Sequence, residues 1–242
     1  MNKIVRIGGI GIDLCLFRTD DEAIEEYTKW IADEEINCWI GQHTNVLEYR
    51  DEEEWVNRKI SNNVKRFNIV SREDHKLIGN CDITIDDYSR NACLGILIGE
   101  KSGRDKGYGT EAIKLLVKYC FDELNMHNVW LQVNGDNKRA IRCYEKARFK
   151  VCITEKESIW MHRHWCDTLT MQILEQEYER IAEHYLDDIV NRYIGSNKRI
   201  NTKYLDKITN SKETRFGEDL SIDLDNKDDD NGYFGTHTID FQ

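Results

Sequence analysis

The stretch that decides the fold runs from an apolar segment into a glycine-rich loop and reads Ile96-Leu97-Ile98-Gly99-Glu100-Lys101-Ser102-Gly103-Arg104-Asp105-Lys106-Gly107-Tyr108-Gly109-Thr110. The apolar run that begins it, residues 92–98, suits a buried central strand. The loop opens onto an amphipathic helix whose apolar residues recur three and four positions apart, at Ala112, Leu115, Leu116 and Tyr119. The first amides of such a helix lack helical partners, and its dipole favours an anion. Arg104 and Lys106 add positive charge, so the segment indicates a phosphate or pyrophosphate site.

The glycines of this loop are compatible with several ligands. Gly107 and Gly109 let the backbone approach a ligand without a Cβ in the way. The loop lacks the G-x-x-x-x-G-K-[ST] pattern of a P-loop, and Ala112 stands where a dinucleotide fingerprint has its third glycine. A tight turn at a helix start, without any ligand, would also explain the pattern. A nucleotide-dependent oxidoreductase therefore stays open on this loop alone.

A second stretch, from Asn137 to Phe149, narrows the choice. Arg104-x-x-Gly107-x-Gly109 resembles the R/Q-x-x-G-x-G/A signature of the GNAT superfamily of N-acetyltransferases. Asn137-x-x-Ala140-x-x-x-Tyr144-x-Lys146-x-x-Phe149 resembles the N-x-x-A-x-x-x-Y-x-K-x-G-F element of the same superfamily. The resemblance covers roughly residues 10–178, within the branch that contains ribosomal-protein N-terminal acetyltransferases and spermidine acetyltransferases.

The resemblance implies an α+β fold, with a mixed, twisted central sheet of about seven strands flanked by helices. In such folds the fourth strand separates from the fifth, and the pantetheine arm of acetyl-CoA lies in the gap. The strand residues would bond pantetheine through their backbone, and the loop would wrap the pyrophosphate. The residues that it implies for acetyl-CoA, with no metal, are Ile96, Leu97, Ile98, Arg104, Asp105, Lys106, Gly107, Tyr108, Gly109, Thr110, Asn137, Ala140 and Tyr144.

The reaction that the resemblance implies is transfer of an acetyl group to a primary amine by direct attack in a ternary complex. The acceptor is expected to be a small molecule or a peptide N-terminus, and its ammonium group must first lose a proton. A backbone N–H at Ile98 or its neighbour would stabilise the oxyanion. Tyr144 is the candidate catalytic residue, as the proton donor to the leaving thiolate.

Two departures from the family pattern leave alternatives open. Arg148 stands where the glycine before Phe149 is expected, and Cys93 replaces an acidic residue often found early in the fourth strand. The general base is therefore open among Asp82, Glu157 and a chain of water molecules. The same departures keep a second class of function in view, a non-catalytic acyl-CoA-binding or scaffold protein.

The remaining sequence predicts alternating strands and helices. The strands are expected over residues 11–17, 67–71, 76–85, 92–98, 129–133, 149–154 and 165–174, with a loop-like segment at 33–51. Besides the helix after the loop, helices are expected up to residue 32 from an N-cap among residues 19–21, over 52–60, and over 137–147. Apolar residues spaced three or four apart predict one further amphipathic helix from about 174 to 194.

The pattern divides the chain into an acetyltransferase domain at residues 1–178 and a C-terminal extension at 179–242. The extension is expected to be helical to about residue 194 and then acidic, because residues 217–242 hold eight acidic residues and one basic residue. A solvated, partly disordered tail is one interpretation. An ordered segment that packs on the core or on a second subunit, as in a homodimer, is the other.

Composition excludes several classes of function. The formal net charge of −11 disfavours a general nucleic-acid binder, and no apolar run is long enough for a membrane span. The eight cysteines never occur as C-x-x-C, so we expect a reduced, cytoplasmic protein without disulfides or a zinc site. His162-Arg163-His164 is interpreted as a loop rather than as a metal-binding pair.

Overall fold

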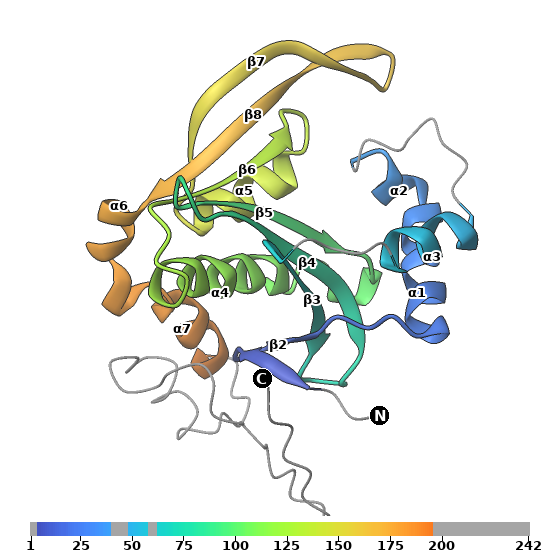
Figure 1. The fold of residues 1–242 in the computed structure, drawn as a ribbon, viewed down its shortest axis with the longest axis horizontal. Helices are drawn as coiled ribbons and strands as arrows, with labels where there is room; N and C mark the ends of the chain where they lie inside the picture. The colour runs from blue at the N-terminus through green and yellow to red at the C-terminus, as the bar shows by residue number, and fades with distance from the viewer. Residues whose placement is uncertain (1–3, 40–47, 58–61, 196–242) are drawn as a thin grey trace, which may run out of the picture.

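The structure is a computed structural model that describes residues 4–39, 48–57 and 62–195 (Figure 1). Its centre is an eight-stranded mixed sheet in the order β1-β2-β3-β4-β5-β6-β8-β7. The strands are β1 (Val5–Gly8), β2 (Ile12–Leu16), β3 (Val64–Ser71), β4 (Leu77–Asp86), β5 (Asn91–Ile98), β6 (Asn128–Asn134), β7 (Lys150–Met161) and β8 (His164–Leu174). The helical segments are α1 (Asp21–Ala32), α2 (Glu34–Asn37), α3 (Tyr49–Asn57), η1 (Lys101–Gly103), α4 (Tyr108–Asp122), α5 (Lys138–Lys146), α6 (Glu175–Glu179), η2 (Ala182–His184) and α7 (Asp187–Gly195).

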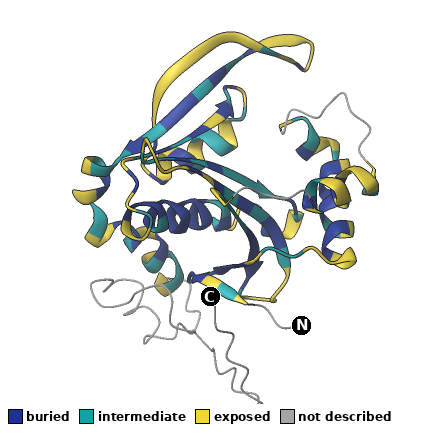
Figure 2. Ribbon diagram, in the orientation of Figure 1, coloured by how far each residue is buried: buried dark blue, intermediate teal, exposed yellow. Residues whose placement is uncertain are grey.

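The two faces of the sheet carry separate apolar clusters. The larger cluster joins α4 to β2–β6 and β8, and α4 is buried along almost its whole length (Figure 2). The smaller cluster is formed by α1 with Ile36 of α2 and Val56 of α3. On β5, Ile96 and Ile98 pack against the larger cluster, whereas Leu97 packs against the smaller one, as the alternation of a strand requires. Strand β5 therefore separates α4 from the α1–α3 layer.

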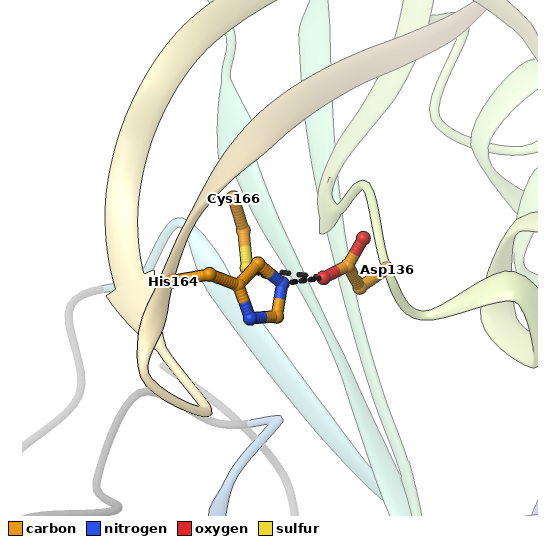
Figure 3. Close-up of side chains that lie close together, drawn as sticks. All are labelled: Asp136, His164 and Cys166. Carbon is orange, nitrogen blue, oxygen red and sulfur yellow. Dashed lines mark hydrogen bonds and ion pairs between the residues drawn. The ribbon is translucent and has the colours of Figure 1, made fainter.

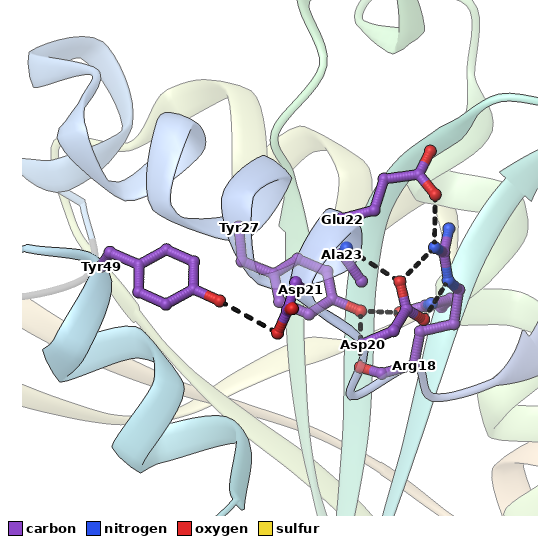
Figure 4. Close-up of polar contacts among 8 residues, drawn as sticks. Arg18, Asp20, Asp21, Glu22, Ala23, Tyr27 and Tyr49 are labelled. Atoms are coloured by element: carbon purple, nitrogen blue, oxygen red, sulfur yellow. Dashed lines mark hydrogen bonds and ion pairs between the residues drawn. The ribbon is translucent and has the colours of Figure 1, made fainter.

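A network of polar contacts fixes the start of α1 (Figure 4). Asp20 is the N-cap, since its carboxylate accepts the Ala23 amide at 3.2 Å. The Tyr27 hydroxyl donates to Asn68 of β3 at 2.7 Å, and burial raises its pKa to about 12. The Tyr49 hydroxyl donates to Asp21 at 3.3 Å and so ties α3 to the first turn of α1. The α1–α3 layer is thus anchored to the sheet at one end.

The mixed sheet confirms the predicted fold class, with differences in detail. Strand β1, which was not predicted, pairs antiparallel with β2 and raises the number of strands to eight. The segment expected to be a loop at 33–51 contains α2 and the beginning of α3. Strand β7 runs on to Met161, because it pairs with β8 as far as His164.

The single C-terminal helix predicted at 174–194 is wrong, because the segment forms α6, η2 and α7. The break lies at Ile181, whose φ of −125° and ψ of 0° leave the helical region. The predicted apolar spacing still serves burial, since Tyr178 and Tyr185 belong to the larger core cluster and Ile189 is buried. The Tyr185 hydroxyl also donates to the carbonyl of Ala147 at 2.7 Å.

The described part of the predicted extension is therefore packed on the same core as the rest of the fold. The predictions for residues 196–242, the acidic tail and its possible contacts, lie outside the described residues. None of the described helices has the length and apolar character that crossing a membrane requires.

Candidate active site

The central feature of the site is the parting of β5 from β6. The two strands pair in parallel over only three residue pairs, Asn91–Asn128, Ala92–Val129 and Cys93–Trp130. Beyond that point β5 keeps its pairing with β4 on one side, while β6 pairs with β8. Residues 94–98 of β5 and 131–134 of β6 therefore form no backbone hydrogen bonds with each other. This is the gap predicted between the fourth and fifth strands, displaced by one in the count because of β1.

The three strand residues predicted to bind pantetheine lie on the parted portion of β5. Ile96, Leu97 and Ile98 are all half-buried, and their backbone faces β4 on one edge only. An extended arm of a ligand could add to the other edge as a strand does. The geometry thus provides amide and carbonyl groups in a row, and no strand of the described part of the chain pairs with them on the β6 side.

The glycine-rich loop follows directly and shapes the beginning of α4. Gly107 is the N-cap of α4, with a φ of +81° that favours glycine and no side-chain cap. The first helical hydrogen bond runs from the Glu111 amide to the Gly107 carbonyl at 3.0 Å. The amides of the three residues before it, which include Gly109 and Thr110, are therefore outside the helical ladder. A Cβ at Gly109 would lie 3.6 Å from Ile98, so the loop and the strand are in close contact.

The charged side chains of the loop are mostly held by neighbouring acids. Arg104 donates to Glu35 and to the Gly99 carbonyl, each at 3.1 Å. Lys106 lies 3.4 Å from Glu73. The remaining predicted loop contacts are the Asp105–Arg139 ion pair at 3.6 Å, the Tyr108 hydroxyl on Glu73 at 3.3 Å, and the Thr110 hydroxyl on Cys143 at 3.4 Å. The ring of Tyr108 is buried in the core, so this residue offers a ligand its backbone amide only.

Helix α5 carries the second motif, and its Cys143 lies against Gly109 and Thr110 at the start of α4. The side chain of Asn137 caps α5, because it accepts the Ala140 amide at 3.0 Å, and Ala140 is half-buried. The Tyr144 ring is buried and lies 6.3 Å from the Phe149 ring. Its hydroxyl makes no hydrogen bond to another residue in the described part of the chain. Burial raises the pKa of Tyr144, which keeps the phenol protonated and able to donate.

Arg148, which stands in place of the expected glycine before Phe149, has the left-handed backbone conformation that favours glycine. Arg148 has a φ of +74°, a left-handed conformation that costs a residue with a Cβ about 1–2 kcal/mol. The Phe149 amide still bonds to the Tyr144 carbonyl at 3.0 Å. The departure from the motif therefore changes the side chain at the end of α5 and not the turn.

A second group of ionisable side chains lies on the other face of the sheet, next to the point where β5 and β6 part. Asp82 of β4 faces Gly95 of β5, and a Cβ on that glycine would lie 2.7 Å from the carboxylate. Burial raises the pKa of Asp82, while the charge of Arg66 on β3 opposes the rise. Burial also raises the pKa of Glu52 on α3 to about 7, again with Arg66 opposing. The positive charge of Arg66 thus lowers the pKa of both carboxyl groups, while burial raises them.

Sequence reasoning named Asp82 as a possible base but missed Glu52 and Arg66. Arg66 lies 3.9 Å from the centre of the Trp55 ring of α3, so its position depends on how the preceding helix packs on β3. Glu157, the other carboxylate considered, is exposed on β7, where its amide donates to Asp167. Cys93 is half-buried, and burial raises its pKa to about 11, so it remains a protonated thiol.

The loop at His162-Arg163-His164 brings one histidine to two other polar side chains (Figure 3). His164 Nε2 lies 2.6 Å from Asp136, and the Cys166 thiol lies 3.2 Å from the same carboxylate oxygen. The three side chains satisfy one another by hydrogen bonds next to Asn137. His162 instead stacks edge-on against Trp39, with ring centres 5.7 Å apart. The two histidines of this loop therefore point to different partners.

The Asp136 contact sets a measurable property of His164. The hydrogen bond from Asp136 raises the pKa of His164 above its ordinary 6.5. We expect an Asp136→Asn variant to return that pKa towards its ordinary value, followed by NMR titration of the histidine Cε1 proton. His184→Gln, which removes an exposed histidine elsewhere, should leave the titration of His164 unchanged. If His164 has the same pKa in Asp136→Asn as in the unaltered chain, Asp136 is not the cause of the raised pKa.

Comparison with known proteins identifies the family. The model of the acetyltransferase (GNAT) domain matches residues 13–150, more than half of the chain. The chain belongs to the GNAT acetyltransferase family. It is 27% identical over 191 residues to an N-acetyltransferase 9-like protein of Caenorhabditis briggsae. That alignment covers 73% of this chain and 86% of the relative. It is 29% identical over 154 residues to a spermidine N(1)-acetyltransferase of Vibrio cholerae, which covers 60% of this chain and 88% of the relative.

A solved structure supports the fold of this GNAT protein. The crystal structure of spermidine N-acetyltransferase from Vibrio cholerae, in complex with CoA and spermine, matches with a TM-score of 0.62 at 22% identity. The match covers 70% of this chain and 98% of that one. The suspected superfamily and the N-acetyltransferase class are thereby confirmed. The individual site residues stay predictions.

Proposed function

We propose that this GNAT protein transfers the acetyl group of acetyl-CoA to the primary amine of a small molecule or of a peptide N-terminus. The observation that carries the proposal is the open edge of β5, which leads into the Gly107 loop. Tyr144 belongs to the core cluster against which Ile96 and Ile98 of that strand pack. Acetyl-CoA supplies an activated thioester. The residues that would hold it are the backbone of Ile96–Ile98, the amides at the start of α4, and Asn137.

The loop fits a diphosphate on physical grounds. The left-handed Gly107 turns the amides of the first α4 turn outward, and Gly109 leaves space where a side chain would approach Ile98. Arg104 has only 13% of its side chain exposed and is oriented by Glu35 and Gly99. Its guanidinium therefore adds a fixed positive charge beside the loop, which favours an anionic group.

We propose Asp82 as the group that accepts the proton of the acceptor amine. Gly95, which it faces, lies just beyond the last β5–β6 pair at Cys93, at the mouth of the gap. After the ammonium group has lost one proton to solvent, the neutral amine nitrogen forms a bond to the acetyl carbon and gives one of its two remaining protons to Asp82, which returns it to solvent. The carbon–sulfur bond breaks. The Tyr144 hydroxyl gives its proton to the departing sulfur, and solvent restores the phenol. The raised pKa of Asp82 makes it a stronger base than an exposed aspartate.

The acceptor is proposed to be cationic. Asp82 and Glu52 are two carboxyl groups near the single guanidinium of Arg66, and Glu52, with a pKa of about 7, is partly ionised at neutral pH. The chain as a whole has a net charge of −11, which attracts a cation. An ammonium group that enters this region gains attraction, and it can be delivered as a neutral amine after it loses its proton. The similarity to spermidine acetyltransferases makes polyamines the first acceptors to test.

The direct test of this function is the Tyr144→Phe variant. We expect kcat with a responsive amine to fall about 10- to 100-fold, because loss of a proton donor removes one of the groups that assist thiolate departure. The dissociation constant for CoA should stay within about twofold, since the ring remains. The measurement follows free thiol release from acetyl-CoA across a panel of amines, with Tyr88→Phe as control because Tyr88 is 99% exposed.

The same assay separates catalysis from the alternative of a scaffold. Saturable CoA binding without amine-dependent thiol release across polyamines, amino sugars and peptides would support the non-catalytic acyl-CoA-binding protein. Thiol release that Tyr144→Phe leaves unchanged would remove Tyr144 from the mechanism while keeping the enzyme. The homodimer and the cytoplasmic location stay predictions.

A further inference from the structure

The C-terminal helix α7 places a guanidinium group against the glycine-rich loop before α4, which is called the phosphate loop below because it is the proposed site of the CoA phosphates. A Cβ on Gly107 would lie 1.7 Å from Nη1 of Arg192, so the arginine occupies the space in front of that glycine. Gly107 is the N-cap of α4, at the centre of the signature that runs from Arg104 to Gly109. Figure 1 shows α7 beside α4, at the end of the described chain. Arg192 lies outside the matched family region, which ends at residue 150.

This guanidinium lacks a protein partner at one of its nitrogens. Nη1 of Arg192 is buried and makes no hydrogen bond. An unpaired buried donor on a charged group is costly, and the cost disappears when an anion binds there. No ion pair links Arg192 to any acid among the residues that the structure describes, in contrast to Arg104 and Lys106, which both contact glutamates.

The acids near Arg192 are engaged by other groups. Asp188, one turn earlier on α7, forms an ion pair with Lys114 of α4. Glu111 accepts the amides of the β1–β2 turn and the Tyr193 hydroxyl. The positive charge of Arg192 is therefore available to a ligand of the loop.

The backbone that carries Arg192 is held in place on both sides. The neighbouring Tyr193 donates to Glu111 at 3.2 Å, and Ile189 of α7 is 1% exposed. The Lys114–Asp188 contact adds a third attachment between α7 and α4. The arginine is thus pre-positioned at the loop, which reduces the conformational entropy lost on binding.

We infer that Arg192 binds a phosphate group of coenzyme A, so that the segment after the family domain completes the cofactor site. The inference rests on the proposed function. A guanidinium forms charge-assisted hydrogen bonds with phosphate oxygens, and here it would act together with the amides that Gly107 exposes. The ligand offers a diphosphate and a 3′-phosphate, and the experiment distinguishes them.

The test is calorimetric titration of the full chain with CoA. We expect Arg192→Ala to raise the dissociation constant for CoA about 10- to 100-fold, which is the range for losing a hydrogen bond to a charged group. Arg192→Lys should recover part of the loss, because it keeps the charge but not the fork. Arg180→Ala, which removes an exposed arginine from the same segment, should bind as the unaltered chain does.

A second ligand identifies the phosphate. If the 3′-phosphate is the partner, the unaltered chain and Arg192→Ala should bind 3′-dephospho-CoA equally well. If the diphosphate is the partner, Arg192→Ala should still bind 3′-dephospho-CoA more weakly than the unaltered chain does. Either result supports the inference, provided that thermal unfolding without ligand shows Arg192→Ala to be as stable as the unaltered chain.

The CoA titrations distinguish failure of the Arg192 inference from failure of the proposed function. Equal or tighter CoA binding by Arg192→Ala, or an affinity loss matched by loss of ligand-free stability, would overturn the role of Arg192 while the proposed function stands. If the unaltered chain does not bind CoA at all, the proposed function fails and this inference fails with it.

Discussion

Replacing Asp82 by asparagine is expected to lower kcat for amine acetylation about 100- to 1000-fold. The substitution preserves size but removes the proposed proton acceptor next to the gap between β5 and β6, and general base catalysis typically contributes a factor of this order. Affinity for CoA should change little, since Asp82 lies on β4 and not on the phosphate loop. The measurement is steady-state kinetics with a saturating amine, together with calorimetric titration of CoA.

The pH profile tests the role of Asp82 separately from its effect on rate. A base acts when it has lost its proton, so kcat/KM should fall as the pH drops through the folded-state pKa of Asp82. That pKa lies above 3.8, because burial outweighs the attraction of Arg66. In Asp82→Asn this acidic limb should disappear from the profile, whereas a residue of purely structural importance would lower the rate without changing the shape.

Matched variants separate Asp82 from the other carboxylates. Asp86→Asn changes an exposed aspartate at the end of the same strand and should leave kcat unchanged. Glu157→Gln tests the other carboxylate that the sequence suggested, and it should also be active because Glu157 is exposed on β7. Full activity of Asp82→Asn would assign the proton transfer to another group, with Glu52 next in order because its pKa is about 7.

The arrangement of the proposed cofactor side of the site follows from local sequence, and that of the proposed acceptor side does not. The strand, loop and helix around Gly107 are contiguous in the chain, so glycine spacing and helical periodicity were sufficient to predict their arrangement. Asn137 is a further local case, since its capping of α5 depends on residues three positions away. In contrast, Glu52, Arg66 and Asp82 meet only because α3, β3 and β4 pack together.

The C-terminal segment shows a second limit of sequence reasoning. Its apolar spacing predicted burial correctly, but spacing alone does not report the backbone break at Ile181 that separates α6 from α7. The position of Arg192 against Gly107 depends on how α7 packs on α4, which the spacing also does not report. A charged residue on an amphipathic helix normally faces solvent. No pattern in the sequence distinguishes this arginine from the others.

Removing the carboxylate of Glu111 is expected to destabilise the fold by about 3–5 kcal/mol, the largest stability effect that we predict. This side chain, 1% exposed on α4, accepts the amides of Ile10, Gly11 and Ile12 at 2.6, 2.8 and 3.4 Å. It also accepts the Tyr193 hydroxyl at 3.2 Å. Glu111→Ala would remove this acceptor from the buried amides of Gly11 and Ile12, and each such donor costs about 1–3 kcal/mol.

The Glu111 prediction also connects stability to the cofactor site. The carboxylate joins the β1–β2 turn to α4 on one side and to α7, through Tyr193, on the other. Denaturant unfolding should show the full loss in Glu111→Ala and less than about 0.5 kcal/mol in Glu123→Ala, an exposed glutamate at the end of the same helix. Tyr193→Phe removes only the α7 link, so it should cost about 1 kcal/mol. A loss below about 1 kcal/mol in Glu111→Ala would mean that water replaces the carboxylate as acceptor, and that this contact does not hold the turn and α7 against α4.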